Sequence, residues 1–98
     1  MPITLEGYTF SGPYYHNRRF NQDFGCVYIL VNGLNQLVDV GQTDNINSRI
    51  INHERKMCWI RNGCVDSGLY IYISPDENFR LLLERLIRTK YRPLCGQQ

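Results

Sequence analysis

Residues 25–53 read GCVYILVNGLNQLVDVGQTDNINSRIINH, and this stretch holds the clearest structural pattern in the chain. Residues 26–31 are apolar and rich in β-branched and aromatic side chains, which is typical of a strand. Asn and Gly dominate residues 32–35 and favour a tight turn, because both tolerate positive φ. Residues 37–40 are apolar again apart from Asp39. Because the connection is short, the pattern predicts two antiparallel strands.

A helix is predicted directly after the second strand. Gly41 ends that strand, and the side chain of Thr43 or Asp44 can cap a helix by accepting a hydrogen bond from a free backbone N–H. Arg49 and His53 are four residues apart, so both are expected to project from one face of this helix. The sequence therefore places an arginine and a histidine together, close to the end of the second strand.

Residues 68–98 supply a third strand and a long helix. Alternating side chains predict the strand over residues 68–73, and the helix begins near Asp76 and ends before Pro93. Apolar residues at helical spacing predict a core stripe made of Phe79, Leu82, Leu83, Leu86 and Ile87. We expect an α+β domain over residues 25–98, with a small three-stranded antiparallel sheet flanked by helices.

Residues 1–24 are rich in Tyr, Asn, Arg and Gly and show no clean period. We expect an irregular N-terminal arm whose aromatic side chains pack on the domain. The full length of 98 residues fits a single domain.

The composition is that of a folded globular chain, with 43% hydrophobic and 20% charged residues. Its net charge of +2 neither requires nor excludes a nucleic-acid partner. No apolar run approaches the roughly 20 residues of a membrane span, and the N-terminus lacks the pattern of a secretion signal. We therefore expect a cytoplasmic protein that has no membrane partner.

Four cysteines are present, and none forms a C-x-x-C pair. In a cytosolic chain they are expected to be mostly reduced thiols, and Cys26 to be a small buried residue within a strand. An alternative is a structural zinc site, for which the candidate ligands are His53, Cys58, Cys64 and Cys95.

The ordered motifs over roughly residues 25–96 resemble the core of the GIY-YIG nuclease family. That family uses a tyrosine on each of its first two strands, a helical arginine and a glutamate on a late helix. Tyr28, Arg49 and Glu84 stand at the matching positions, and His53 matches a histidine found in some branches. Gly41 matches the glycine of the second motif, and Pro93 matches a proline common after the late helix.

This resemblance implies an endonuclease that hydrolyses nucleic-acid phosphodiester bonds with a single divalent cation, Mg²⁺ or Mn²⁺. Glu84 would hold the cation, because a hard cation prefers oxygen ligands. Arg49 offers a planar fork for a phosphate, and Tyr28 would orient the attacking water or relay its proton. His53, whose ordinary pKa is near 6.5, is the candidate general base.

Two positions depart from the family pattern: Asp39 replaces the second tyrosine, and Gly96 replaces a late asparagine. A carboxylate at position 39 can accept a proton or support a metal, but it also adds negative charge where a polyanion must approach. Our hypothesis from the sequence is that Asp39 keeps a proton-accepting or metal-supporting role.

Each candidate residue also has a structural alternative. Tyr28 can be an ordinary strand aromatic. Arg49 can pair with Glu54 at the surface. His53 can interact favourably with the C-terminus of the helix.

The alternatives extend to the function of the whole chain. An ion-pair ladder with Arg80 and Arg88 would explain Glu84 without any metal. The chain would then be a catalytically impaired module of the same fold that binds nucleic acid or protein. Nucleic acid, with DNA in the first place, is the expected partner. Specificity would have to come from the N-terminal arm, from residues 57–67 or from a protein partner, and a homodimer could supply two sites for two strands.

Overall fold

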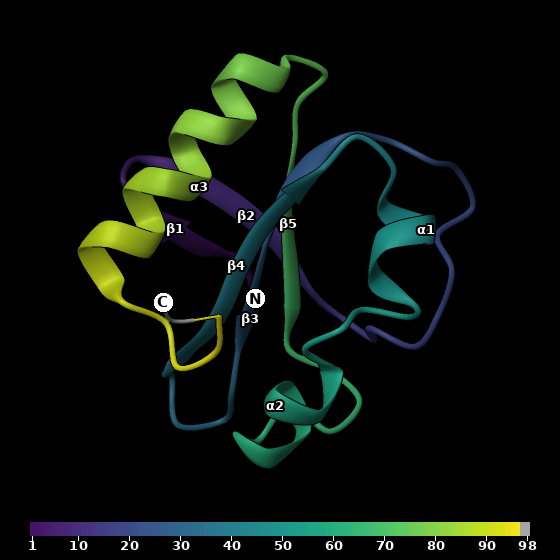
Figure 1. The fold of residues 1–98 in the computed structure, drawn as a ribbon, viewed down its shortest axis with the longest axis vertical. Helices are drawn as coiled ribbons and strands as arrows, with labels where there is room; N and C mark the ends of the chain where they lie inside the picture. Colours follow the sequence, from purple (N-terminus) through teal and green to yellow (C-terminus); the bar gives the residue numbers. More distant parts are fainter. Residues whose placement is uncertain (97–98) are drawn as a thin grey trace.

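The computed structural model describes residues 1–96, which form a five-stranded antiparallel sheet with three helices (Figure 1). In chain order the elements are β1 (Ile3–Leu5), β2 (Tyr8–Tyr14), β3 (Cys26–Val31), β4 (Leu37–Thr43), α1 (Ile46–Ile50), α2 (Lys56–Arg61), β5 (Leu69–Ile73) and α3 (Glu77–Tyr91). The strands lie in the order β1-β2-β5-β3-β4, and every neighbouring pair is antiparallel. The α+β class and the predicted antiparallel pair are confirmed. None of the helices in this range has the length and apolar character needed to cross a membrane.

The predicted three-stranded sheet is wrong, because residues 1–24 contribute two further strands where we expected an irregular arm. β1 and β2 form a hairpin that turns at Glu6 and Gly7, where φ is 53° and 82°. β2 then pairs with β5, so β5 lies between β2 and β3 in the sheet. Phe10 is fully buried in β2. β2 has seven residues, but it contains Gly12 and Pro13, and both residue types are uncommon inside strands.

β3 lies within the sheet, and its residues Cys26–Leu30 are fully buried. Alternate β3 side chains share one core with Leu83 and Ile87 of α3. The others share a second core with Ile46 of α1 and Trp59 of α2. The sheet therefore separates α3 from the two short helices (Figure 1). Side chains from the two faces can meet only at an edge of the sheet, and β4 is one such edge.

The core-facing stripe of α3 is narrower than the sequence predicted. Leu83 and Ile87 are buried and Phe79 is partly buried, but Leu82 is 66% exposed and Leu86 is 44% exposed. The prediction is wrong for these two leucines because α3 packs against one face of the sheet only, which leaves its outer side to solvent.

The first predicted helix is also shorter than expected, because α1 ends at Ile50. Its N-cap is Asn45, whose Oδ1 accepts a hydrogen bond from the Ser48 N–H at 3.1 Å. His53 follows in a turn, where its N–H donates to the Ile50 carbonyl at 3.3 Å. Arg49 and His53 therefore do not share a helical face, and the sequence prediction on this point is wrong.

A disulfide joins Cys58 of α2 to Cys95, whereas Cys26 and Cys64 are free and buried. The expectation of reduced thiols is therefore wrong for one pair of cysteines. The alternative zinc set is not assembled, because two of its sulfurs are bonded to each other.

The chain after α3 returns along the free edge of β4. The Leu94 N–H donates to the Leu37 carbonyl at 3.2 Å, and the Cys95 N–H donates to the Val38 carbonyl at 2.7 Å. These two bonds cover the beginning of β4. The edge beyond them, at Gly41 and Gln42, belongs to a pocket.

Candidate functional site

A cavity of about 410 Å³ opens beside β4, where side chains from both faces of the sheet come together. Its lining residues are Tyr28, Gly41, Gln42, Arg49, Arg55, Glu84, Arg88 and Gly96. Three residues predicted from the sequence, Tyr28, Arg49 and Glu84, thus meet in one pocket. The other two, Asp39 and His53, are buried behind its wall.

Gly41 is what lets Tyr28 reach the pocket. The two residues are cross-strand partners in β4 and β3. A Cβ on residue 41 would overlap the hydroxyl and Cζ of Tyr28 and lie 3.0 Å from its Cε1. A side chain at this position would therefore displace the ring.

His53 holds the Tyr28 hydroxyl from behind. The Nε2 atom of His53 lies 2.8 Å from the Tyr28 hydroxyl, and the Arg55 backbone N–H donates to Nδ1 at 3.0 Å. Because Nδ1 accepts a hydrogen bond, the proton of the neutral ring is on Nε2, which donates to Tyr28. The proton of the Tyr28 hydroxyl is then free to point into the pocket.

The protonation states of Tyr28 and His53 suit this hydrogen bond. Burial, followed by the charges of Arg49 and Arg55, lowers the pKa of His53 to about 4. Burial also raises the pKa of Tyr28 well above its usual range. Both groups are therefore neutral near pH 7. The geometry makes His53 a positioning residue for Tyr28, since its Nε2 donates a proton in this arrangement and does not accept one.

Asp39 is fully buried and does not face the pocket. Its Oδ1 accepts hydrogen bonds from the Val40 N–H at 2.8 Å and from Arg88 Nη2 at 3.0 Å. Its Oδ2 accepts from Arg55 Nε and Trp59 Nε1, both at 2.7 Å. These four bonds occupy both oxygens of the carboxylate, so the proton-accepting or metal-supporting role that we expected from the sequence does not fit this geometry. Asp39 instead anchors two arginines of the pocket wall.

Arg88 ties the C-terminal segment to the site. Its donors reach the Asp39 carboxylate and the carbonyls of Val40, Cys95 and Gly96. Its Nε also lies 3.6 Å from Glu84 Oε2. Arg88 is therefore committed to protein partners, and it affects a ligand chiefly through its charge.

Arg49 and Arg55 are the cations that a ligand can reach. Arg49 forms a two-pronged ion pair with Glu54, with N–O distances of 2.6 and 3.1 Å. This is the structural alternative considered for Arg49, and it holds the pKa of Glu54 down at about 2. Arg55 uses Nε for Asp39, and its Nη1 lies 3.6 Å from Glu54. A phosphate matches the fork that Glu54 now occupies.

Among residues 1–96, Glu84 is the one carboxylate that lines the pocket. Its side chain is 27% exposed, and its ion pair with Arg88 is long, at 3.6 Å. Within residues 1–96 neither of its oxygens accepts a hydrogen bond, so both can bind a ligand. A single carboxylate that is joined by waters and phosphate oxygens suits Mg²⁺ or Mn²⁺. Glu84 therefore fits a cation site whose remaining ligands are waters and phosphate oxygens of the substrate.

Sequence reasoning missed Gln42 and Arg55. Gln42 is the next residue after Gly41, but nothing in its type or spacing marks it as a wall residue. Arg55 does not stand out in the sequence either, because its link to Asp39 crosses 16 residues. Both are brought to the pocket by tertiary contacts.

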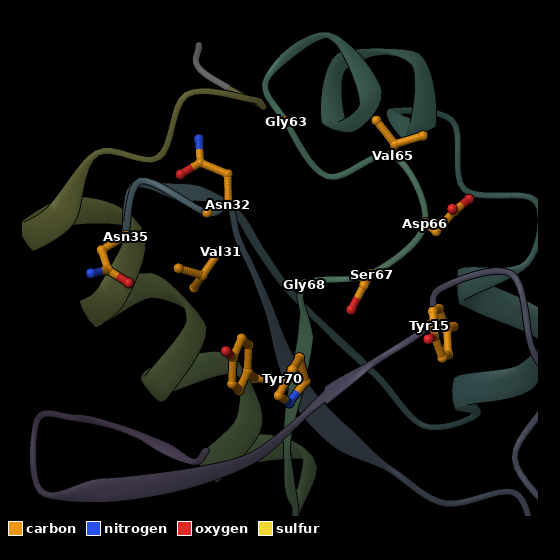
Figure 2. Close-up of a pocket in the computed structure, with 12 residues that line it drawn as sticks. Tyr15, Val31, Asn32, Asn35, Gly63, Val65, Asp66, Ser67, Gly68 and Tyr70 are labelled. Atoms are coloured by element: carbon orange, nitrogen blue, oxygen red, sulfur yellow. The ribbon is translucent and has the colours of Figure 1, made fainter.

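A second hollow, of about 520 Å³, lies among residues that do not line the first pocket (Figure 2). Tyr15 and Tyr70 contribute to its wall, together with Asp66 and the loop before β5. In the described part of the chain, no Lys, Arg or His lines it. The pocket beside β4 is therefore the better candidate for binding a phosphate.

Comparisons with protein-family models, with curated proteins and with solved structures return no match to this chain. The likeness to GIY-YIG nucleases rests on the motif residues quoted above.

Proposed function

We propose that the chain is a metal-dependent endonuclease that hydrolyses nucleic-acid phosphodiester bonds in the pocket beside β4. The main support is the Tyr28 hydroxyl, which is held by His53 and faces a pocket that also contains Arg49 and Glu84. Hydrolysis of a phosphodiester needs a held phosphate, an oriented water and stabilisation of the growing negative charge. The pocket contains a group for each requirement.

The arginines would bind the phosphate. Arg49 would exchange the carboxylate of Glu54 for two phosphate oxygens, and the Nη groups of Arg55, whose Nη1 now lies 3.6 Å from Glu54, would reach the same anion. The buried charge of Asp39 keeps Arg55 in place while it does so. This exchange leaves the number of ion pairs at Arg49 unchanged.

Tyr28 would orient the reacting oxygen. Its hydroxyl has one proton to donate to the pocket and accepts a hydrogen bond from His53. Glu84 would hold the divalent cation, which when bound supplies charge neutralisation and a water of lowered pKa. Each of these residues comes from a different element, so the site depends on the complete fold.

The test is a cleavage assay with duplex, nicked, branched and single-stranded DNA, and with RNA, in Mg²⁺ or Mn²⁺. We expect metal-dependent cleavage that is lost in Glu84→Gln and reduced in Tyr28→Phe. Glu77→Gln is the matched control, because Glu77 is an exposed carboxylate on the same helix that does not line the pocket. Equal activity in the Glu84→Gln and wild-type proteins would contradict the assignment.

A second candidate function is nucleic-acid binding without cleavage. It is favoured by Asp39, which stands where the family has its second tyrosine and whose carboxylate is occupied by two arginines, the Trp59 indole and the Val40 N–H. The observation that identifies this function is binding that weakens steeply with salt, as counterions are released from the phosphates, while no substrate in the panel is cleaved.

A further inference from the structure

Arg80 is a buried cation that has no carboxylate partner within residues 1–96. It is 4% exposed. Its Nη1 donates to the Ser74 carbonyl at 3.0 Å, and its Nε donates to Gln42 Oε1 at 3.1 Å. A guanidinium keeps its charge at every accessible pH, and burying a charge without a counterion is unfavourable. Within residues 1–96, the acceptors of the Arg80 side chain, the Ser74 carbonyl and Gln42 Oε1, are both neutral.

The backbone is shaped to admit this guanidinium. A Cβ on Gly25 would lie 2.7 Å from Arg80 Nη1 and 3.0 Å from the Ser74 carbonyl oxygen. Any larger residue at position 25 would therefore displace the charge. Arg80 of α3 therefore connects the Ser74 carbonyl to Gln42 of β4.

The contact with Arg80 also determines how the amide of Gln42 is oriented. Arg80 Nε can only donate, so the amide atom that faces it is the oxygen Oε1. The amide nitrogen and its two N–H groups are directed away from Arg80. Gln42 is a wall residue of the pocket and is partly exposed. Within the described part of the chain, its Nε2 has no hydrogen-bond acceptor.

We propose that Gln42 is a substrate-contacting residue, that its Nε2 donates a hydrogen bond to a phosphate oxygen in the pocket, and that Arg80 is the positioning residue that orients and polarises this amide. The cation lies behind the oxygen end of the amide dipole, so the dipole directs its positive end toward an anion in the pocket. This inference rests on the proposed function, because the phosphate is that of a nucleic-acid backbone.

Two substitutions at position 42 separate substrate contact from a structural role. Gln42→Met has a similar length and removes the donor. Gln42→Glu keeps an oxygen for Arg80 and gives it a counterion, but it places negative charge beside the ligand. Gln22→Met is the matched control, because Gln22 is exposed and does not line the pocket.

Binding is measured without metal, in EDTA, with inorganic phosphate and with short single-stranded DNA as the probes. Gln42→Met removes a hydrogen bond to a charged group, so its affinity for the probes should fall roughly tenfold or more. Gln42→Glu should bind more weakly still, and its thermal unfolding temperature should equal or exceed that of the wild type. The side-chain amide resonances of Gln42 should shift when phosphate is added, whereas Gln22→Met should bind like the wild type.

The outcomes distinguish this inference from the proposed function. If the wild type binds the probes but does not cleave nucleic acid, the hydrolysis proposal fails and a loss of binding in Gln42→Met still supports the contact. If the wild type cleaves and Gln42→Met binds and cleaves normally, the contact alone is overturned. If the wild type binds neither probe, the contact is overturned, and the hydrolysis proposal is judged by the cleavage assay alone.

Discussion

The Tyr28 hydroxyl occupies the space that a side chain on Gly41 would need. Gly41→Ala should therefore push the ring from its place and cost about 1–3 kcal/mol of unfolding free energy, the usual penalty for overpacking. Because Tyr28→Ala removes the obstacle, the double variant should be less destabilised than the sum of the single variants. Urea unfolding of the four proteins measures this coupling.

Gly33→Ala is the control for that cycle, because a Cβ at this turn residue meets nothing within 4 Å. It should change stability little. Strict additivity of the Tyr28 and Gly41 substitutions would show that the two side chains do not compete for this space.

Asp39→Asn should strongly destabilise the protein, since it removes the shared counterion of Arg55 and Arg88. Breaking a buried ion pair by removing one partner typically costs about 3–5 kcal/mol. Chemical unfolding gives the value. Asp66→Asn, at an exposed carboxylate, should stay within about 0.5 kcal/mol of the wild type. A loss below about 1 kcal/mol in Asp39→Asn would contradict the anchoring role.

Glu54→Gln should tighten the binding of DNA. Glu54 occupies the fork of Arg49, so a phosphate that binds this arginine must displace it. Exposed ion pairs are worth up to about 1 kcal/mol, which predicts roughly two- to fivefold higher affinity at low salt. Fluorescence anisotropy over a salt series measures the effect, which should shrink as salt screens the charges.

Asp44→Asn removes an equal charge from an exposed carboxylate outside the pocket and should have a smaller effect. Equal tightening in the two variants would mean that Glu54 acts through net charge alone and does not compete for Arg49.

Stability should fall as the pH drops from about 6.5 toward 4. The pKa of His53 is lowered to about 4 in the folded protein, so the unfolded chain binds more protons in this window and unfolding becomes easier. The stabilisation is complete above the unfolded pKa of about 6.5, and roughly 2 kcal/mol of it is lost between pH 7 and pH 5. Unfolding curves at several pH values measure the slope.

The pKa of His16 is also lowered by burial, so some slope should remain when His53 is replaced. His53→Gln should nevertheless flatten the curve. A His53 ring that titrates near 6.5 in the native protein by NMR would contradict the buried, neutral state.

Reduction of the Cys58–Cys95 disulfide should release the segment that crosses the edge of β4. The bond joins residues 37 apart, and a loop of that size supports a stabilisation of about 2–4 kcal/mol. Unfolding with and without reductant measures the loss, and mass spectrometry after thiol alkylation counts the free thiols. A Cys58→Ser/Cys95→Ser variant should be insensitive to reductant. Alkylation of all four cysteines in unreduced protein would contradict the bond.

Local patterns were enough to predict the β3–β4 hairpin, β5 and the long helix α3. Each of these elements carries its own signal: a turn rich in Asn and Gly, a two-residue alternation, or a helical cap at Asp76. The β1–β2 pair was missed because β1 has only three residues, and because β2 contains Gly12 and Pro13 and pairs with β5, which is distant in the sequence. The exposed Leu82 and Leu86 were misassigned because helical spacing identifies apolar faces without saying which one meets the sheet.

The sequence by itself determined the α+β class, the antiparallel hairpin and the candidate set that contains Tyr28, Arg49 and Glu84. These features depend on residue type and on spacing along the chain. Only the tertiary structure decided what each side chain contacts. Asp39 is an internal counterion for Arg55 and Arg88, and Gln42 is a pocket residue whose amide accepts a hydrogen bond from Arg80. The reason is physical: burial and charge pairing depend on side chains that distant segments bring together, and spacing within one segment does not specify them.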